Sequence, residues 1–96
     1  MSISRATGAT PNAESYMRKL GQHWSYEYPV TFEPADTCTI RLAHAVCQLH
    51  ATPDELKIEV TVDPAEDQVR IEGVVERHIK RFGFREELQF PWQRAA

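Results

Sequence analysis

The chain has little of what marks several large classes of protein. Its 96 residues include only two cysteines, too few for a disulfide-stapled secreted domain, so we expect both to be reduced thiols. No apolar run approaches the roughly 20 residues that cross a bilayer, and the N-terminus lacks the basic and then apolar segments of a secretory signal. We therefore expect a single cytoplasmic domain, spanning residues 1–96, with no membrane partner.

An excess of positive charge is also missing. The net charge is −3 and the isoelectric point lies near 5.8, whereas affinity for nucleic acid comes mainly from lysine and arginine that displace counterions from phosphates. No glycine-rich phosphate loop, HExxH pattern or serine elbow is present. The sequence thus predicts no nucleic-acid partner, no cofactor and no catalytic residues, and we expect a protein that is not an enzyme.

A long amphipathic helix is the best-marked element that is present. Asp63 suits its N-cap, Pro64 its first position and Glu66 a capping box, and Gly83 is expected as its left-handed stop. An apolar stripe predicts one buried face, formed by Ile71, Val74, Val75, His78, Ile79 and Phe82. Glu72, Glu76, Arg77, Lys80 and Arg81 take the opposite side. After Gly83, a two-residue period predicts a final strand over 84–92 whose inner side chains are Phe84, Leu88, Phe90 and Trp92.

Upstream, a second helix is expected to open at Pro11, capped by Thr10, and to end near Ser25. Residues 2–9 alternate weakly and indicate a short first strand. From residue 28 to 62 the period is two, which predicts a meander of four strands. One sheet face is then apolar and the other polar, and the two helices can cover the apolar face. The predicted fold is a two-layer α+β sandwich, with two helices on one face of an antiparallel sheet of four to six strands.

Several segments resemble a bacterial family known only as domain of unknown function 2218. The likeness covers almost the whole chain and is most specific in the run R-F-G-F-R-E-E-L, residues 81–88; it is also carried by Tyr16, Leu20, His23-Trp24, Gly73-Val74-Val75, His78-Ile79 and Trp92-Gln93. The resemblance implies a TATA-binding-protein-like sandwich and a setting in siderophore handling or iron uptake, because such domains occur beside siderophore-interacting proteins. The related sandwich of phosphohexomutases uses a phosphate-binding loop that this chain lacks.

Cysteine and histidine side chains form the nearest thing to a metal cluster: Cys38, His44, Cys47 and His50. With residues 43–45 as a hairpin connection, Leu42 faces Cys47, and Cys38 lies roughly 13 Å along the ladder from Cys47. His50 points to the polar face and both cysteines point to the core. We therefore predict buried thiols, no disulfide and no metal site.

A second group gathers where the two helices end. It comprises His23, Trp24, His78, Arg81, Arg85 and Glu86. One interpretation is structural: the arginines support helix ends or pair with nearby glutamates, and His78 bonds to backbone at the rim of the core. The other is a shallow site where an indole, imidazoles and guanidinium groups bind an anionic or aromatic ligand. Glu86 is expected to need a partner, with His23 or Arg81 as candidates.

Three functions remain open from the sequence. The first is a non-catalytic binding or accessory module that takes a siderophore or contacts a siderophore-interacting protein. The second is a small enzyme acting on a siderophore fragment, with His23 or His78 and Glu86 as acid and base. The third is a self-associating module that uses the polar sheet face or an edge strand, and the expected state is a monomer or weak homodimer.

Overall fold

Six strands and two helices make up the protein, seen in a computed structural model that describes residues 2–33, 36–63 and 67–94. The elements follow in the order β1 (Ser2–Ala9), α1 (Ala13–Trp24), β2 (Val30–Glu33), β3 (Thr37–Leu42), β4 (Ala45–Ala51), β5 (Glu55–Val62), α2 (Gln68–Phe82) and β6 (Gln93–Arg94). Among these described residues, no helix is long and apolar enough to span a membrane.

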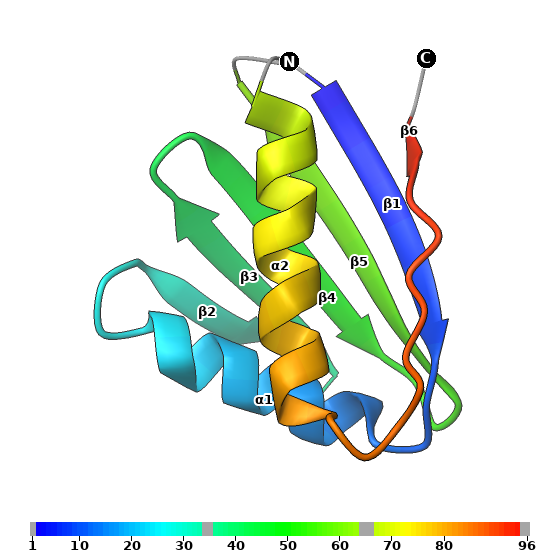
Figure 1. Cartoon of the computed structure of the whole chain (residues 1–96). Helices are drawn as coiled ribbons and strands as arrows, with labels where there is room; N and C mark the ends of the chain where they lie inside the picture. The colour runs from blue at the N-terminus through cyan, green and yellow to red at the C-terminus, as the bar shows by residue number, and fades with distance from the viewer. Residues whose placement is uncertain (1, 34–35, 64–66, 95–96) are drawn as a thin grey trace.

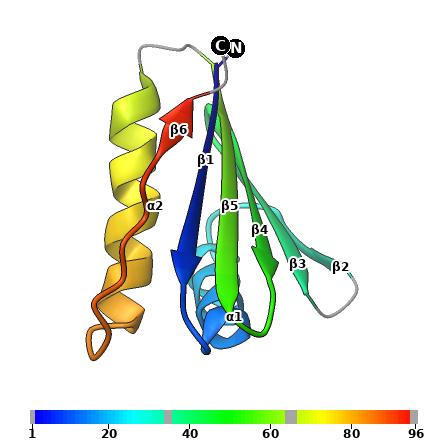
Figure 2. The ribbon, with the colours of Figure 1, turned by 90° about the vertical axis from the view of Figure 1, so that its right-hand side faces the viewer.

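All strands belong to one antiparallel sheet in the order β2-β3-β4-β5-β1-β6. Both helices pack on the same face, with α1 over β2 to β5 and α2 over β5 and β1, and the helices cross at a steep angle (Figure 1). The edge-on view in Figure 2 shows the second face of the sheet uncovered. This confirms the predicted α+β sandwich of two layers; the TATA-binding-protein-like grouping stays a prediction.

The weak alternation at the start of the chain is a full strand. β1 pairs with β5 along its whole length, from Ser2 opposite Val62 to Ala9 opposite Glu55. Its helix-facing side chains are small, which makes room for other parts of the chain: a Cβ on Gly8 would lie 2.4 Å from the Phe90 ring. Small residues therefore reflect close packing on β1 and not an absence of core contacts.

Helix α1 begins at Ala13, two residues later than predicted. Asn12 occupies the N-cap position, and its backbone N–H donates to the Thr10 hydroxyl at 3.1 Å. The buried stripe of α1 is formed by Ala13, Tyr16, Met17, Leu20, Gly21 and Trp24. A Cβ on Gly21 would lie 2.5 Å from the Phe32 ring and 3.0 Å from the Cys38 sulfur. Glycine inside this helix is explained by that close approach to the sheet.

Helix α2 begins at Gln68, with Asp67 as its N-cap, so the predicted start at Asp63 is wrong. The proposed roles of Pro64 and Glu66 lie outside the described residues. The predicted stripe is confirmed, with Val75 and Ile79 fully buried. The sequence prediction that Glu72 lies on the solvent side of this helix is wrong, because only 6% of the residue is exposed.

The segment after α2 also departs from the sequence prediction. Gly83 has φ of −100°, so it is not a left-handed stop; a Cβ there would lie 2.6 Å from Leu88 and 2.9 Å from the Tyr16 ring. Residues 84–92 form no strand, and of the described chain after α2 only β6 joins the sheet, where it pairs with the free edge of β1. Figures 1 and 2 show this segment running along β1 beside α2. Leu88 and Phe90 are buried as predicted, whereas Phe84 is 75% exposed.

The hairpin between β3 and β4 turns on two residues, 43 and 44, and not on three. Ile40 therefore faces Cys47, and Leu42 faces Ala45. This register places Cys38 opposite Leu49, two residues from Cys47, or roughly 7 Å along the ladder instead of 13 Å. Because the slip is an even number of residues, every side chain stays on its predicted face.

Candidate functional site

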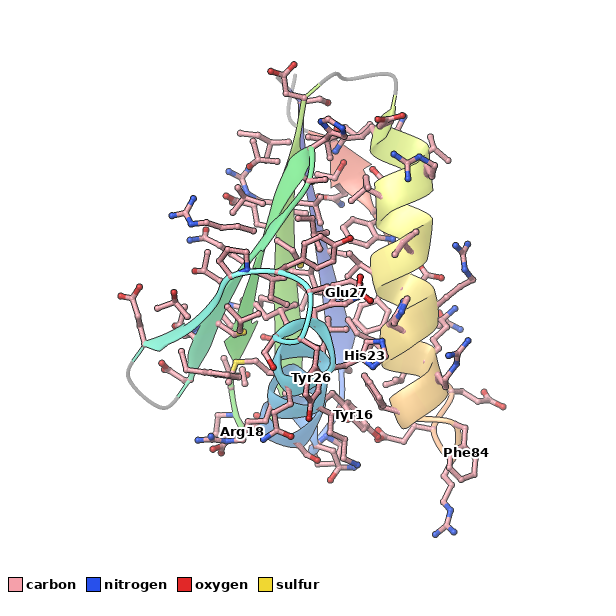
Figure 3. The ribbon with its side chains drawn as sticks, turned by 90° about the vertical axis from the view of Figure 1, so that its left-hand side faces the viewer. Tyr16, Arg18, His23, Tyr26, Glu27 and Phe84 are labelled. Atoms are coloured by element: carbon pink, nitrogen blue, oxygen red, sulfur yellow. The ribbon has the colours of Figure 1, made fainter. Side chains whose placement is uncertain are left out.

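Three rings from the two helices meet between them. The ring centres of His23 and His78 are 5.2 Å apart, and those of Trp24 and His78 are 4.9 Å apart. Phe82, one turn beyond His78, lies 6.3 Å from His23 with its ring edge-on. Trp24 is 7% exposed, while His23 is exposed, and Figure 3 shows His23 on the side of α1 that faces α2. His78 is thus brought to side chains 54 and 55 positions earlier in the sequence, and three of the six residues of the predicted group meet.

His78 has a fixed orientation. Its Nδ1 lies 2.7 Å from the carbonyl oxygen of Val74, and because a carbonyl only accepts, Nδ1 carries the proton. This confirms the predicted bond to backbone for a half-buried rim histidine. It also leaves Nε2 as the unprotonated nitrogen when the ring is neutral.

A pocket of about 250 Å³ opens next to this cluster, between the start of α1 and the residues that follow α2. Its lining combines polar and aromatic side chains: Asn12, Ser15, Tyr16, Lys19, Phe82, Gly83, Phe84, Arg85 and Glu86. The Arg85 guanidinium lies 5.4 Å from the centre of the Phe84 ring. Among the described residues it forms no ion pair with Glu86 or Glu87. We call this pocket, together with the adjoining rings of His23 and His78, the interhelix groove.

Two cations that line the interhelix groove, Lys19 and Arg85, and a third that precedes Phe82 in the sequence, Arg81, have no carboxylate partner among the residues described. Lys19, Arg81 and Arg85 are exposed, and within the described part of the chain none of them forms an ion pair. The sequence interpretation had overlooked Lys19. Its position was readable, because it precedes His23 by four residues and therefore lies on the same side of α1.

Glu86 has other partners than those predicted. Its carboxylate accepts hydrogen bonds from the Thr10 hydroxyl at 2.7 Å, from the Asn12 side-chain amide at 2.9 Å and from the Tyr16 hydroxyl. Neither His23 nor Arg81 is involved. The Tyr16 hydrogen bond, followed by those from Asn12 and Thr10, lowers the pKa of Glu86, and burial followed by the bond to Glu86 raises the pKa of Tyr16. Glu86 therefore joins the segment after α2 to the start of α1 as a charged carboxylate.

Glu72 forms a second buried polar cluster that the sequence did not reveal. It accepts hydrogen bonds from the Ser4 hydroxyl and from Arg94 at 3.1 and 3.2 Å, and Gln68 donates to Ser4. Ser4 is fully buried, and Gln68 and Glu72 are nearly so. The cluster links α2, β1 and β6, and its enclosed serine is closed to a substrate, so its role is structural.

Cys38, His44, Cys47 and His50, the four residues weighed as metal ligands in the sequence, do not converge on one point. Both cysteines are fully buried, and burial raises the pKa of Cys38 to about 11 and that of Cys47 further. His44 is exposed at the hairpin tip, and His50 lies on the uncovered sheet face, 3.3 Å from the Thr37 hydroxyl. Within the residues that the structure describes, no three His, Cys, Asp or Glu side chains are grouped so as to hold a metal ion.

The uncovered face of the sheet carries a hollow of about 400 Å³. Its polar lining comes from β1, β3, β4 and β5: Arg5, Thr7, Thr37, Gln48, His50, Lys57 and Glu59. Arg5 is neutralised by Glu59 at 2.8 Å, and no Phe, Tyr or Trp ring lines the hollow. It therefore lacks the phenyl ring faces that stand beside the unpaired cations of the interhelix groove.

Comparison with known proteins places the chain in a family. The profile of the family described as "Uncharacterized protein conserved in bacteria (DUF2218)" matches residues 5–93. The NMR structure of PA4090 from Pseudomonas aeruginosa is similar, with a TM-score of 0.81 and 25% sequence identity over 97% of this chain and 96% of that one. No curated protein matches the sequence. The chain belongs to the bacterial DUF2218 family.

Proposed function

We propose that this protein is a non-catalytic module that binds a small aromatic anion in the interhelix groove. The observation that carries the proposal is the pairing of unpaired cations with ring faces: Lys19 and Arg85 line the same pocket as Phe82 and Phe84. Guanidinium groups bind carboxylates through two parallel hydrogen bonds, and ring faces stack on planar ligands. A catechol carboxylate has both the anionic and the planar part.

Glu86 supports the binding role over the acid–base role. A general acid or base needs a pKa near the working pH and a free carboxyl oxygen within reach of its substrate. Three donors already occupy the Glu86 carboxylate, and its pKa is lowered instead of raised. Its hydrogen bonds set the pocket wall and supply no proton for a reaction.

The ligand class suggests a setting. Catecholates and hydroxy acids are the iron-binding groups of many siderophores, and the family resemblance implies an iron-uptake context. We therefore propose that the module handles a siderophore or a siderophore fragment. The matched family description names no ligand, so this step depends on the chemistry of the groove.

The proposal is tested by calorimetric titration with 2,3-dihydroxybenzoate, alone and as its ferric complex. We expect binding to the wild-type protein that weakens at least tenfold in Arg85→Ala and in Lys19→Ala, since each loses a charged contact. Lys57→Ala removes an exposed cation from the sheet face and serves as the matched control. Absence of binding to the wild type, or equal loss in Lys57→Ala, would refute the proposed ligand or its site.

Docking of a protein partner is a second candidate, favoured by two exposed aromatic side chains, Tyr26 and Phe84. Tyr26 is 91% exposed and Phe84 is 75% exposed, and aromatic and arginine side chains dominate interface hot spots. Figure 3 shows both residues at the surface, Tyr26 after α1 and Phe84 beyond the end of α2. A siderophore-interacting protein is the proposed partner. Its binding should weaken more than tenfold in a Tyr26→Ala, Phe84→Ala double variant, and unchanged binding would exclude this surface.

A further inference from the structure

Two imidazoles in the interhelix groove lie at the separation that a shared metal ion produces. Metal–nitrogen bonds to histidine are about 2.0–2.1 Å, so each ring centre lies roughly 3.2 Å from the ion. Two such rings have centres about 4.5 Å apart when the bonds meet at a right angle and about 5.2 Å apart when they meet at the tetrahedral angle. The ring centres of His23 and His78 are 5.2 Å apart, with the planes tilted by 51°.

The hydrogen bond of His78 is the second, independent observation. Histidines that bind metals almost always donate their other ring N–H to a carbonyl or a carboxylate, which fixes the ring and makes the ligating nitrogen more basic. His78 makes this bond through Nδ1 to the Val74 carbonyl at 2.7 Å. Its Nε2 is then the ligating nitrogen, held in place by the helix.

We propose that His23 and His78 form a two-imidazole site for a divalent late transition metal, with copper(II) bound most tightly. Imidazole suits copper, nickel and zinc, and affinity for such ligands rises to a maximum at copper. Within the described residues no third His, Cys, Asp or Glu completes the site, so the remaining coordination positions stay with water or with oxygens of a small chelator. This open coordination distinguishes the site from a closed structural zinc site.

The surroundings fit a surface site of moderate affinity. Trp24 and Phe82 flank the imidazoles and limit access from the core side, while the exposed ring of His23 keeps the site open to solvent. Arg81 lies three residues after His78, but its exposed charge is screened by water and salt. The site does not depend on the aromatic anion proposed above, because the metal alone occupies it.

Copper(II) alone is the probe, followed by calorimetry and by electron paramagnetic resonance. The wild type should bind one copper(II) with hyperfine coupling to two nitrogens, and His23→Ala should bind at least tenfold more weakly with one nitrogen remaining. His23 is exposed, so this variant should fold. The other two histidines give the matched control, His44→Ala, His50→Ala, which should bind as the wild type does.

Two results would overturn the site. One is a wild-type spectrum without coupling to two nitrogens, and the other is an affinity that falls in the His44→Ala, His50→Ala control as much as in His23→Ala. His78→Gln gives a further check, because glutamine keeps a polar side chain at a half-buried position. Its copper affinity should fall as in His23→Ala while its circular dichroism matches the wild type. Failure here leaves the 2,3-dihydroxybenzoate titration unaffected, so the two proposals can fail separately.

Discussion

Replacing Glu86 with glutamine should destabilise the protein by loosening the segment after α2. The carboxylate accepts three hydrogen bonds, from Thr10, Asn12 and Tyr16. Glutamine keeps one oxygen and places an amide donor where the second oxygen was, so at least one of the donors loses its acceptor. Bonds to charged groups contribute about 1.5–3 kcal/mol each when buried, but Glu86 is partly exposed and water replaces some of them. We expect a net loss of about 2 kcal/mol.

The loss of stability in Glu86→Gln should depend on pH, because the hydrogen-bonded group is a charged carboxylate. Glu86 has a folded-state pKa below its unfolded value of about 4.3, so its contribution is fully present above that value and is lost as pH falls through the folded pKa. The stability difference between wild type and Glu86→Gln should therefore be largest at pH 7 and shrink at about pH 3. At alkaline pH, the raised pKa of Tyr16 implies stability that is present below about pH 10 and lost as pH rises through the folded value.

Urea denaturation followed by tryptophan fluorescence and circular dichroism measures these differences. The neighbouring Glu87 is exposed, and Glu87→Gln makes the same change in charge at a matched position. It should shift the free energy of unfolding by no more than about 0.5 kcal/mol. The reasoning is refuted if Glu86→Gln and Glu87→Gln are equally stable, or if the effect of Glu86→Gln is the same at both pH values.

Three further predictions concern packing and buried polar groups. Glu72→Ala removes the carboxylate that accepts hydrogen bonds from Ser4 and Arg94, so the free energy of unfolding measured by thermal denaturation should fall by about 2–3 kcal/mol. Glu14→Ala, on the exposed side of α1, should change it little. Gly83→Ala places a methyl group against Tyr16 and should cost about 1–3 kcal/mol by the same measurement, and an unchanged melting temperature would contradict the close contact. The buried thiols should react with Ellman's reagent only after unfolding, because burial raises the pKa of Cys38 to about 11; rapid reaction of the native protein would show that they are accessible.

Much of the fold was predictable because its signals are local. The two-residue period identified the meander, and the apolar stripe of α2 identified its buried face. The predicted register of the β3–β4 hairpin differs from the observed one by two residues, because a two-residue period does not show how long the turn is. The start of α2 was also misplaced: Asp63 has the residue type of a cap, but Asp67 occupies that position.

The parts that escaped prediction depend on contacts between distant positions. Glu72 is buried because Ser4, 68 residues away, and Arg94 supply its partners. The segment 84–92 alternates like a strand, yet its Phe90 packs against Gly8 and its backbone pairs with no strand before β6. A periodic pattern reports which side chains are buried and does not report where the backbone hydrogen bonds go.

The sequence predicted which rings meet at the candidate site, but not the partners of Glu86 or the presence of Lys19. His23, Trp24 and His78 meet as expected, because each lies on the inner side of its helix near the point where the helices cross. The partners of Glu86 could not be read from the sequence, since they lie just before α1 and in its first turn, 70 to 76 residues away. Lys19 was the missed cation whose helical spacing had placed it beside His23.

The most direct test of the binding role is an NMR titration, since the protein has a mass of only 11.0 kDa. Amide chemical shifts of the ¹⁵N-labelled wild type are followed as 2,3-dihydroxybenzoate is added. The proposed function predicts saturable changes around Lys19, Phe82 and Arg85, with little change along the uncovered sheet face. Changes centred instead on Lys57 and His50, or no saturable change at any residue, would contradict a ligand site between the two helices.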